Sequence, residues 1–247
     1  MRLFKDLKIL YHLVVKPVRG SDHAARMESF YSGQADGYDD FRRRLLKGRE
    51  DLWSAIEVPE GGVWVDMGGG TGSNLEFFDG RIERLKKVYV VDLSASLLDV
   101  AWRRAEDRGW SNVEAVEADA TQYRPEIGPV DVVTFSYSLT MIPDWFAALE
   151  NALAMLKPGG LIGVVDFYVS RKWPAAGQIR HSWFTRSYWP VHFATDNVFP
   201  SPDHVPFLHR RSEPIHFSEH RGKVPYVPLI KMPYYTFVGR KKADERA

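Results

Sequence analysis

The stretch that decides the fold is residues 63–72, Val-Trp-Val-Asp-Met-Gly-Gly-Gly-Thr-Gly. Its first half is apolar and rich in β-branched residues, which predicts a buried strand over Val63–Met67. The glycines that follow allow positive φ angles and a close approach of a ligand to the backbone. A helix predicted over Ser73–Phe78 would point its unpaired N–H groups at the same turn. This segment therefore predicts a strand–turn–helix unit that holds a ligand at one edge of a sheet.

Strands and helices alternate on the C-terminal side of this unit. The apolar runs predict further strands over Val88–Leu93, Val113–Val116, Val130–Ser136 and Leu161–Phe167. Helices are predicted over Ala95–Arg108 and Trp145–Leu156, the second of them stopped by Lys157-Pro-Gly-Gly160. Strands that are apolar along their whole length and flanked by helices indicate an α/β fold with a parallel, doubly wound sheet.

The chain on either side of this core has a different character. Three helices are predicted before it, over 3–15, 24–35 and 39–56, and the first is basic and amphipathic, so that it either packs on the domain or lies in a membrane interface. An aromatic-rich and proline-containing stretch precedes a last strand. We predict a single domain over 1–247, divided into a helical lid or membrane-facing segment (1–58), a cofactor-binding core (61–168), a substrate-side insertion (169–233) and a last strand (234–240).

Composition excludes several classes of protein. The 247 residues include no cysteine, so a disulfide framework, a thiolate zinc site and a cysteine nucleophile are excluded. No apolar run reaches the roughly 20 residues that span a bilayer, and the N-terminus lacks a signal-cleavage pattern, which favours a cytoplasmic location. Segment 51–164 carries 9 basic and 18 acidic residues between two basic ends, a distribution that suits a cationic ligand in the middle. It does not suggest a nucleic-acid partner.

Two further acids follow predicted strands. In dinucleotide-binding folds the glycine turn holds a pyrophosphate and an acid after the second strand, here Asp92, bonds the ribose. Two features favour S-adenosylmethionine over a nicotinamide cofactor. Asp66 precedes the first glycine, where it can meet an ammonium group, and Asp119-Ala120 follows the third strand, where it can bind adenine. A plain turn with a structural aspartate and a nicotinamide site remain the alternatives.

This order of motifs resembles the class I methyltransferases, which have a Rossmann-like, mostly parallel seven-stranded sheet. The resemblance implies that Asp66, Gly68 and Gly70 hold the methionine end of S-adenosylmethionine, while Asp92, followed by Leu93, binds the ribose. It also implies that Asp119 and Ala120 bind the adenine, that Ser136 and Tyr137 lie beside the sulfonium, and that Tyr38 covers the cofactor.

Other blocks of the chain resemble the betaine-lipid methyltransferases in particular. These blocks are residues 26–50, 201–207, 224–228 and 232–241. The resemblance implies threefold N-methylation of diacylglyceryl-homoserine to diacylglyceryl-N,N,N-trimethylhomoserine at the inner face of a membrane, beside a separate aminocarboxypropyl transferase. The alternatives are another amine, such as phosphatidylethanolamine or a soluble amine, and an inactive partner that only binds the cofactor.

Candidates for handling the acceptor amine are mostly tyrosines, because a phenol can orient an amine and its ring attracts a methylammonium. They are Tyr31, Tyr38, Tyr137, Tyr234 and Tyr235, of which we assign Tyr31, Tyr137 and Tyr235 to catalysis. His192 and His204 are candidate bases, and Arg180, Arg186 or Arg210 could bind the carboxylate of the substrate. No metal site is expected from the spacing of the C-terminal histidines.

Overall fold

The computed structural model describes residue 28 and residues 45–78, 80–194, 197–224 and 230–242. Its strands are β1 (Val63–Met67), β2 (Lys87–Asp92), β3 (Val113–Glu117), β4 (Val130–Ser136), β5 (Leu156–Phe167), β6 (Ser212–Lys223) and β7 (Lys231–Lys241). Its helices are α4 (Arg49–Ala55), α5 (Ala95–Arg108), α6 (Trp145–Met155), α7 (Trp183–Ala194) and α8 (His204–Arg211), with short 3-10 helices η1 (Ser73–Phe78), η2 (Ile82–Arg84) and η3 (Leu139–Met141). The helices predicted over 3–15 and 24–35 lie outside the described residues except for Glu28, and Tyr31 and Tyr38 lie outside them too. Within the described part of the chain, no helix combines the length and hydropathy needed to cross a bilayer.

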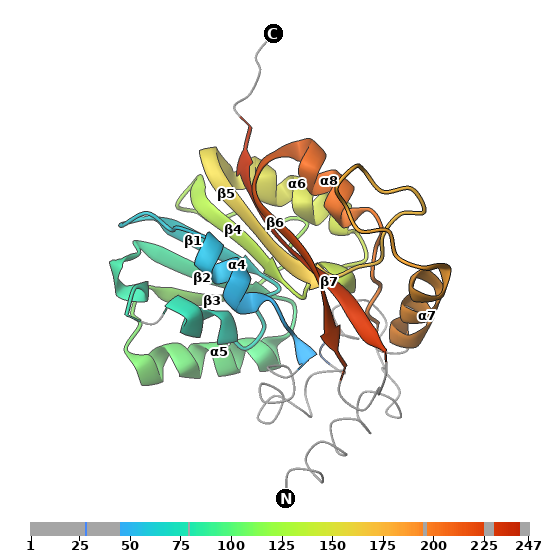
Figure 1. Ribbon diagram of the computed structural model, residues 1–247. Coiled ribbons are helices and arrows are strands. Elements are labelled where there is room, and N and C mark those ends of the chain that lie inside the picture. The colour runs from blue at the N-terminus through green and yellow to red at the C-terminus, as the bar shows by residue number, and fades with distance from the viewer. Residues whose placement is uncertain (1–27, 29–44, 79, 195–196, 225–229, 243–247) are drawn as a thin grey trace, which may run out of the picture.

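One sheet of seven strands runs through the molecule in the order β3-β2-β1-β4-β5-β7-β6 (Figure 1). Strands β1 to β5 are parallel, and β7 is antiparallel to both β5 and β6. The chain winds from β1 outward through β2 to β3 and then crosses back to β4 on the other side of β1. The predicted doubly wound, mostly parallel sheet is confirmed, and the glycine turn after β1 lies where the strand order reverses.

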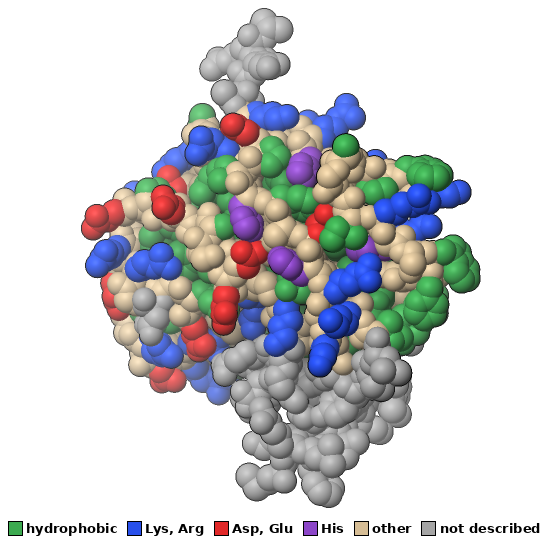
Figure 2. Space-filling view, viewed as in Figure 1, with side chains coloured by type: hydrophobic (Ala, Val, Ile, Leu, Met, Phe, Trp, Pro, Cys, Tyr) green, Lys and Arg blue, Asp and Glu red, His purple; other side chains and the backbone are tan. Residues whose placement is uncertain are grey.

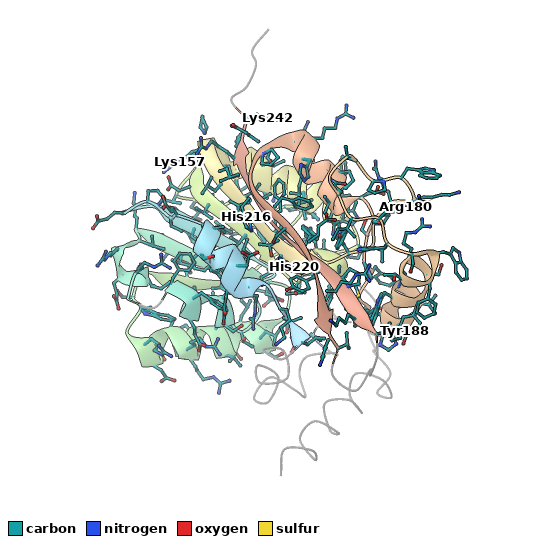
Figure 3. The ribbon with its side chains drawn as sticks, viewed as in Figure 1. Lys157, Arg180, Tyr188, His216, His220 and Lys242 are labelled. Carbon is teal, nitrogen blue, oxygen red and sulfur yellow. The ribbon has the colours of Figure 1, made fainter. Side chains whose placement is uncertain are left out.

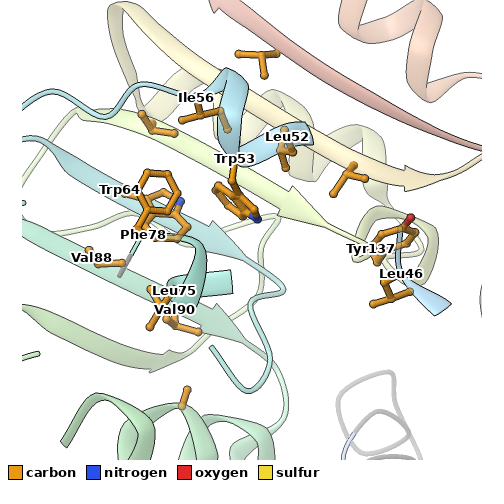
Figure 4. Packing of buried hydrophobic residues seen from close by; sticks show 14 of the residues in the cluster. Leu46, Leu52, Trp53, Ile56, Trp64, Leu75, Phe78, Val88, Val90 and Tyr137 are labelled. Atoms are coloured by element: carbon orange, nitrogen blue, oxygen red, sulfur yellow. The ribbon is translucent and has the colours of Figure 1, made fainter. Parts of the chain in front are cut away.

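Alternate residues of each central strand enter two separate cores, because successive side chains of a strand point to opposite faces. Trp64 packs on one face against Trp53 of α4 and Phe78 of η1, with ring centroids 5.1 and 5.0 Å apart (Figure 4). Val65 packs on the other face in a core that includes Leu149 of α6. The centre of the sheet is therefore buried on both sides, which explains why most positions of its central strands are apolar.

The helix predicted over 39–56 is interrupted at Gly48. Helix α4 begins only at Arg49, and Gly48 has a φ of 79°, in the left-handed region that favours glycine. A Cβ atom at this position would lie 2.5 Å from the ring of Tyr234 in β7. The close approach of β7, which the helical periodicity could not reveal, therefore leaves room only for glycine at the break.

The segment predicted as a substrate-side insertion over 169–233 also carries part of the sheet. It contains α7 and α8, and β6 runs antiparallel to β7 at the edge of the sheet. Pro214 lies at a register shift of β6, which is where a strand tolerates a residue without an N–H donor. The polar residues of β6 hide it from a pattern search because an edge strand is only half buried.

His204, a candidate base for the acceptor amine, lies in the protein core and cannot act as that base. Its ring is fully buried against Trp145, with ring centroids 4.7 Å apart, and neither ring nitrogen has a hydrogen-bond partner among the described residues. Burial lowers the pKa of the imidazole to about 3. The folded protein therefore keeps His204 neutral at pH values where the unfolded chain binds a proton.

This difference predicts a loss of stability in mild acid. Below the ordinary histidine pKa of about 6.5, the unfolded chain gains a proton that the folded chain cannot accept until the pH approaches 3. Between pH 7.5 and 5.5, His204 alone should remove about 1.4 kcal/mol from the free energy of unfolding. His204→Phe should abolish that part of the loss in urea titrations at the two pH values. His220→Phe, at an exposed position, is the matched control and should leave the wild-type loss in place.

Candidate active site

A pocket of about 250 Å³ lies at the carboxyl ends of β1 to β4. Each strand contributes a residue from its carboxyl end or the turn that follows: Gly68 after β1, Asp92 at the end of β2, Asp119 after β3 and Tyr137 after β4. In the part of the chain that the structure describes, the lining residues are Gly68, Gly70, Val91, Asp92, Leu93, Leu97, Ala118, Asp119, Ala120, Thr121, Tyr137, Ser138, Met141, Ile142, Pro143 and Asp144. The fold thus brings together seven of the site residues predicted from the sequence: Gly68, Gly70, Asp92, Leu93, Asp119, Ala120 and Tyr137.

The glycine turn is held against β2 by its own backbone. Gly68 N and Gly69 N both donate to Val91 O, at 2.8 and 3.1 Å. Gly68 has a φ of 65°, and a Cβ atom there would lie 2.3 Å from Cβ of Ser138. The turn therefore needs glycine both for its backbone conformation and for its contact with the segment after β4.

Asp92 links the glycine turn to the helix that follows β2. Its Oδ2 accepts a hydrogen bond from Gly70 N at 2.9 Å, and its Oδ1 accepts one from Ser94 N at 3.0 Å. Ser94 in turn caps α5 and donates through its hydroxyl to Glu28 at 2.7 Å. The carboxylate thus lies in the pocket wall with its orientation set by two backbone donors.

Asp119 and Ala120 form the far wall of the pocket after β3. Asp119 Oδ1 accepts from both the backbone N and the hydroxyl of Thr121, each at 2.8 Å. Ala120 O accepts from the side-chain amide of Asn151 in α6 at 2.9 Å. These bonds fix the turn after β3 relative to α6.

Asp66 does not line the pocket, which differs from its predicted place at the methionine end. Its carboxylate is fully buried and accepts hydrogen bonds from Asn74 Nδ2 at 2.8 Å and Thr134 Oγ1 at 2.7 Å. Burial is the main cause that raises its pKa to about 6, and the nearby charge of Asp92 adds to the rise. In this structure the carboxylate of Asp66 links β1 to Thr134 of β4 and to Asn74 of η1. These two partners enclose it, so that it does not face the pocket.

Tyr137 lines the pocket and has a positive φ of 57°, which is unusual for a residue other than glycine. Its hydroxyl donates to Lys47 O, and its ring meets Phe167 edge-on with centroids 4.6 Å apart. Burial raises the pKa of this phenol well above its ordinary value. Ser136 precedes it, is buried within β4 and is not among the lining residues.

Tyr235, predicted to be catalytic, lies within the sheet and away from the pocket lining. It is fully buried in the core under α8, between Tyr168 and His204. Its neighbour Tyr234 points to the opposite face and packs in the core that contains Tyr137. The alternation of side chains along β7 therefore places Tyr234, and not Tyr235, on the side of Tyr137.

Three charged residues near the site were not predicted from the sequence. Arg49 is buried at the start of α4 and donates to Ser73 Oγ at 3.2 Å. Glu28 bonds Ser94 beside the pocket, as described above. Asp166, at the end of β5, accepts from Thr140 Oγ1 at 2.8 Å, and burial raises its pKa to about 7. None follows a glycine-rich turn, so only their contacts in the folded chain mark them.

The other candidate bases and cations lie elsewhere. The ring of His192 stacks on Tyr188 in α7, and burial lowers its pKa. The guanidinium of Arg180 lies over Trp173, and Arg210 lines a separate hollow beside α8. Among the described residues, no group of three acidic or histidine side chains is placed to hold a metal ion.

Comparison with known proteins agrees with this geometry. A family model described as "Methyltransferase domain" matches residues 65–160. The ubiquinone/menaquinone biosynthesis C-methyltransferase UbiE of Pseudomonas savastanoi pv. phaseolicola is 32% identical over 168 residues, which is 66% of each chain. The match thus spans just under two thirds of the length of that relative.

Residues 65–160 therefore match a methyltransferase domain, and the described chain has the Rossmann-like fold of S-adenosylmethionine-dependent methyltransferases. Its fold is similar to that of N-methyltransferase NodS from Bradyrhizobium japonicum in complex with S-adenosylhomocysteine, with a TM-score of 0.63, 13% identity and coverage of 90% of this chain and 100% of that one. A second methyltransferase of the same fold is phosphoethanolamine N-methyltransferase 2 of Haemonchus contortus, with a TM-score of 0.67, 15% identity and coverage of 93% and 61%.

The lining of the pocket in the methyltransferase domain fits S-adenosylmethionine chemically. The carboxylate of Asp92 can accept the hydroxyl protons of a ribose, and the side chains of Leu93, Leu97 and Ile142 offer apolar surface to a purine ring. Among the described residues, all the charged side chains of the lining, Asp92, Asp119 and Asp144, are acidic, which suits a cationic sulfonium. The residues that would hold the cofactor are thus those at the carboxyl ends of β1, β2 and β3.

Proposed function

We propose that this methyltransferase domain acts on the amine of diacylglyceryl-homoserine and adds three methyl groups to give diacylglyceryl-N,N,N-trimethylhomoserine. The observation that carries the proposal is the acidic character of the pocket wall, since the sulfonium of the cofactor and the methylated ammonium group of the product are both positively charged. The resemblance of four further blocks of the chain to betaine-lipid methyltransferases supports this choice of lipid.

S-adenosylmethionine, when bound, supplies a methyl group activated by its sulfonium. The residues of the chain position the acceptor amine, which must reach them without a proton before each transfer because only the lone pair attacks. The carboxylates of the lining favour the positive charge that develops on nitrogen. The ring of Tyr137 offers a π face to the growing methylammonium, while its hydroxyl remains bonded to Lys47 O.

The named relatives support methyl transfer to nitrogen and also raise a second candidate. Two proteins of the same fold are named N-methyltransferases. The relative that is 32% identical is named a C-methyltransferase of quinone biosynthesis, and methylation of a ring carbon is therefore the second candidate function. Phosphatidylethanolamine, a soluble amine, and cofactor binding without turnover are the further alternatives.

A single assay separates these candidates. The purified full chain, with S-adenosylmethionine, is offered diacylglyceryl-homoserine, phosphatidylethanolamine and a demethylated quinol in detergent micelles, first singly and then in competition. Mass spectrometry should show diacylglyceryl-homoserine with one, two and three added methyl groups. Methylation of the quinol alone would establish the second candidate, and binding of the cofactor without any methylated product would contradict both.

The proposed substrate also implies a partner enzyme and a location at the membrane. The homoserine headgroup must first be attached to diacylglycerol, so we propose functional coupling to a separate aminocarboxypropyl transferase. Because the substrate stays in the bilayer, we propose that the protein acts as a peripheral protein on the cytoplasmic face of the membrane.

A further inference from the structure

Exposed apolar side chains gather in one part of the molecule. Of the ten large hydrophobic side chains that are exposed in the described residues, six lie between residues 173 and 199. This aromatic flank consists of Trp173, Ile179, Trp183, Phe184, Val191 and Phe199. Trp173, Trp183 and Val191 are 69 to 75% exposed. Exposed apolar patches of this kind mark interaction surfaces.

Helix α7 has apolar residues on both its inner and its outer side. Trp189 and Phe193 are buried and stack on each other with ring centroids 5.4 Å apart, which anchors the helix to the core. Trp183, Phe184 and Val191 point outward instead. The outer side of α7 therefore leaves large apolar side chains in contact with water, and a second apolar environment would cover them.

Basic side chains accompany the aromatic flank. Residues 171–199 contain four Lys or Arg and one Asp. The guanidinium of Arg180 lies 4.2 Å from the ring centroid of Trp173, and Nζ of Lys172 lies 5.6 Å from it. Figure 2 shows blue and green side chains together on the flank formed by α7 and the loop before it, and Figure 3 shows Arg180 on that loop. Aromatic rings beside cations are typical of segments that lie in the interface of an anionic membrane.

The aromatic flank lies at the same end of the sheet as the pocket. Phe193 of α7 stacks on Phe167 at 5.4 Å, and Phe167 in turn meets Tyr137 of the pocket lining. Phe199 N donates to Thr140 O at 2.7 Å, next to Met141, which also lines the pocket. A surface that rested on the flank would therefore lie beside the pocket and not behind the sheet.

We propose that the aromatic flank docks on an anionic lipid bilayer, with Trp173, Trp183 and Phe184 in the interface and Lys172 and Arg180 among the lipid phosphates. The inference deepens the proposed function, on which it rests for its biological purpose, by assigning the membrane contact to a defined surface. The excess of basic residues selects an anionic bilayer as the occupant.

Vesicle sedimentation of the full chain tests the surface without any methyl transfer. The wild-type protein should bind vesicles of phosphatidylcholine with phosphatidylglycerol more tightly than vesicles of phosphatidylcholine alone. Trp173→Ser/Trp183→Ser/Phe184→Ser should weaken binding at least about tenfold. Lys172→Gln/Arg180→Gln should weaken binding to the anionic vesicles by about fivefold for each charge removed. Trp102→Ser/Phe146→Ser, which removes two exposed rings outside the flank, is the matched control and should bind like the wild type.

A site-specific probe gives a second, independent readout. Since the chain has no cysteine, Val191→Cys creates a unique site for an environment-sensitive fluorophore. Its emission should shift to the blue on addition of anionic vesicles, whereas the same dye at Phe146→Cys should not respond. Equal responses at the two sites, or unchanged sedimentation of the triple variant, would overturn the proposal. Loss of a dimer in the triple variant without any loss of vesicle binding would assign the surface to a second copy of the chain instead.

Failure of this inference is distinguishable from failure of the proposed function. In detergent micelles, the triple variant should methylate diacylglyceryl-homoserine at the wild-type rate, and in anionic vesicles it should be slower. If the wild type binds vesicles but methylates no lipid, the result supports the docking surface and contradicts the proposed substrate.

Discussion

Asp92→Ala should weaken the binding of S-adenosylmethionine on the order of 100-fold. The change removes a carboxylate from the pocket wall, and a hydrogen bond to a charged group contributes about 1.5–3 kcal/mol. It also removes the acceptor of the hydrogen bonds that Gly70 N and Ser94 N donate to Asp92. The glycine turn therefore loses its link to the end of β2 at the same time as the ribose loses its acceptor.

Isothermal titration calorimetry with S-adenosylmethionine and S-adenosylhomocysteine measures this effect. Asp99→Ala, on the exposed side of α5 only seven residues away, is the control and should leave both dissociation constants unchanged. Both cofactor forms should be affected alike, because the ribose is common to them. An unaltered dissociation constant for Asp92→Ala would mean that the ribose binds elsewhere in the pocket.

Gly68→Ala should lower the free energy of unfolding by about 2–5 kcal/mol and abolish measurable cofactor binding. A left-handed backbone costs a residue with a Cβ atom about 1–2 kcal/mol, and overpacking adds about 1–3 kcal/mol. Both costs arise here, since the new Cβ would lie 2.3 Å from Cβ of Ser138. Chemical unfolding in urea, together with calorimetry on the folded variant, measures the two consequences.

Two further variants separate the cost of the left-handed backbone from the cost of the steric clash with Ser138. Gly128 also has a positive φ, of 89°, but no atom lies within 4 Å of a Cβ built there, so Gly128→Ala should show the backbone cost alone. Adding Ser138→Gly to Gly68→Ala should recover part of the stability, because Cα of Ser138 lies 3.7 Å from the position of the new methyl group. The recovery stays incomplete, since the hydrogen bond from Ser138 Oγ to Met67 O is lost. Equal losses for Gly68→Ala and Gly128→Ala would disprove the collision.

The position of the pocket could be predicted from local patterns. Val63–Met67 and Val130–Ser136 are strands with the predicted bounds, and α5 has its predicted bounds as well. These elements carry strong signals because a strand buried on both faces is apolar throughout, and because Ser94 and Gly109 cap α5 at its two ends. In a parallel sheet, residues that follow successive strands meet at one edge. The convergence of Gly68, Asp92 and Asp119 follows from this rule without any knowledge of side-chain contacts.

The sequence pattern predicts least well those elements whose packing or pairing partners come from distant parts of the chain. Strand β6 is polar and contains a proline, and its pairing with β7 runs along nearly its whole length apart from a register shift at Pro214. A Cβ atom on Gly48 would collide with the ring of Tyr234, which lies far away in sequence. Such contacts leave no local periodicity, so neither β6 nor the break in the third helix could be predicted from the pattern.

By itself, the sequence determined that this chain forms a doubly wound sheet with a glycine turn and three strand-end residues at one edge, since strand period and glycine conformation are local properties. Only the tertiary structure decided which polar side chains enter the pocket. Asp66 and Asp92 both stand at strand ends, yet Asn74 and Thr134 enclose the first while the second borders the pocket. The alternation of β7 likewise places Tyr235 in the core under α8 and Tyr234 on the side of Tyr137. The reason is physical: packing against residues distant in sequence determines which face of a strand is buried and which borders a cavity.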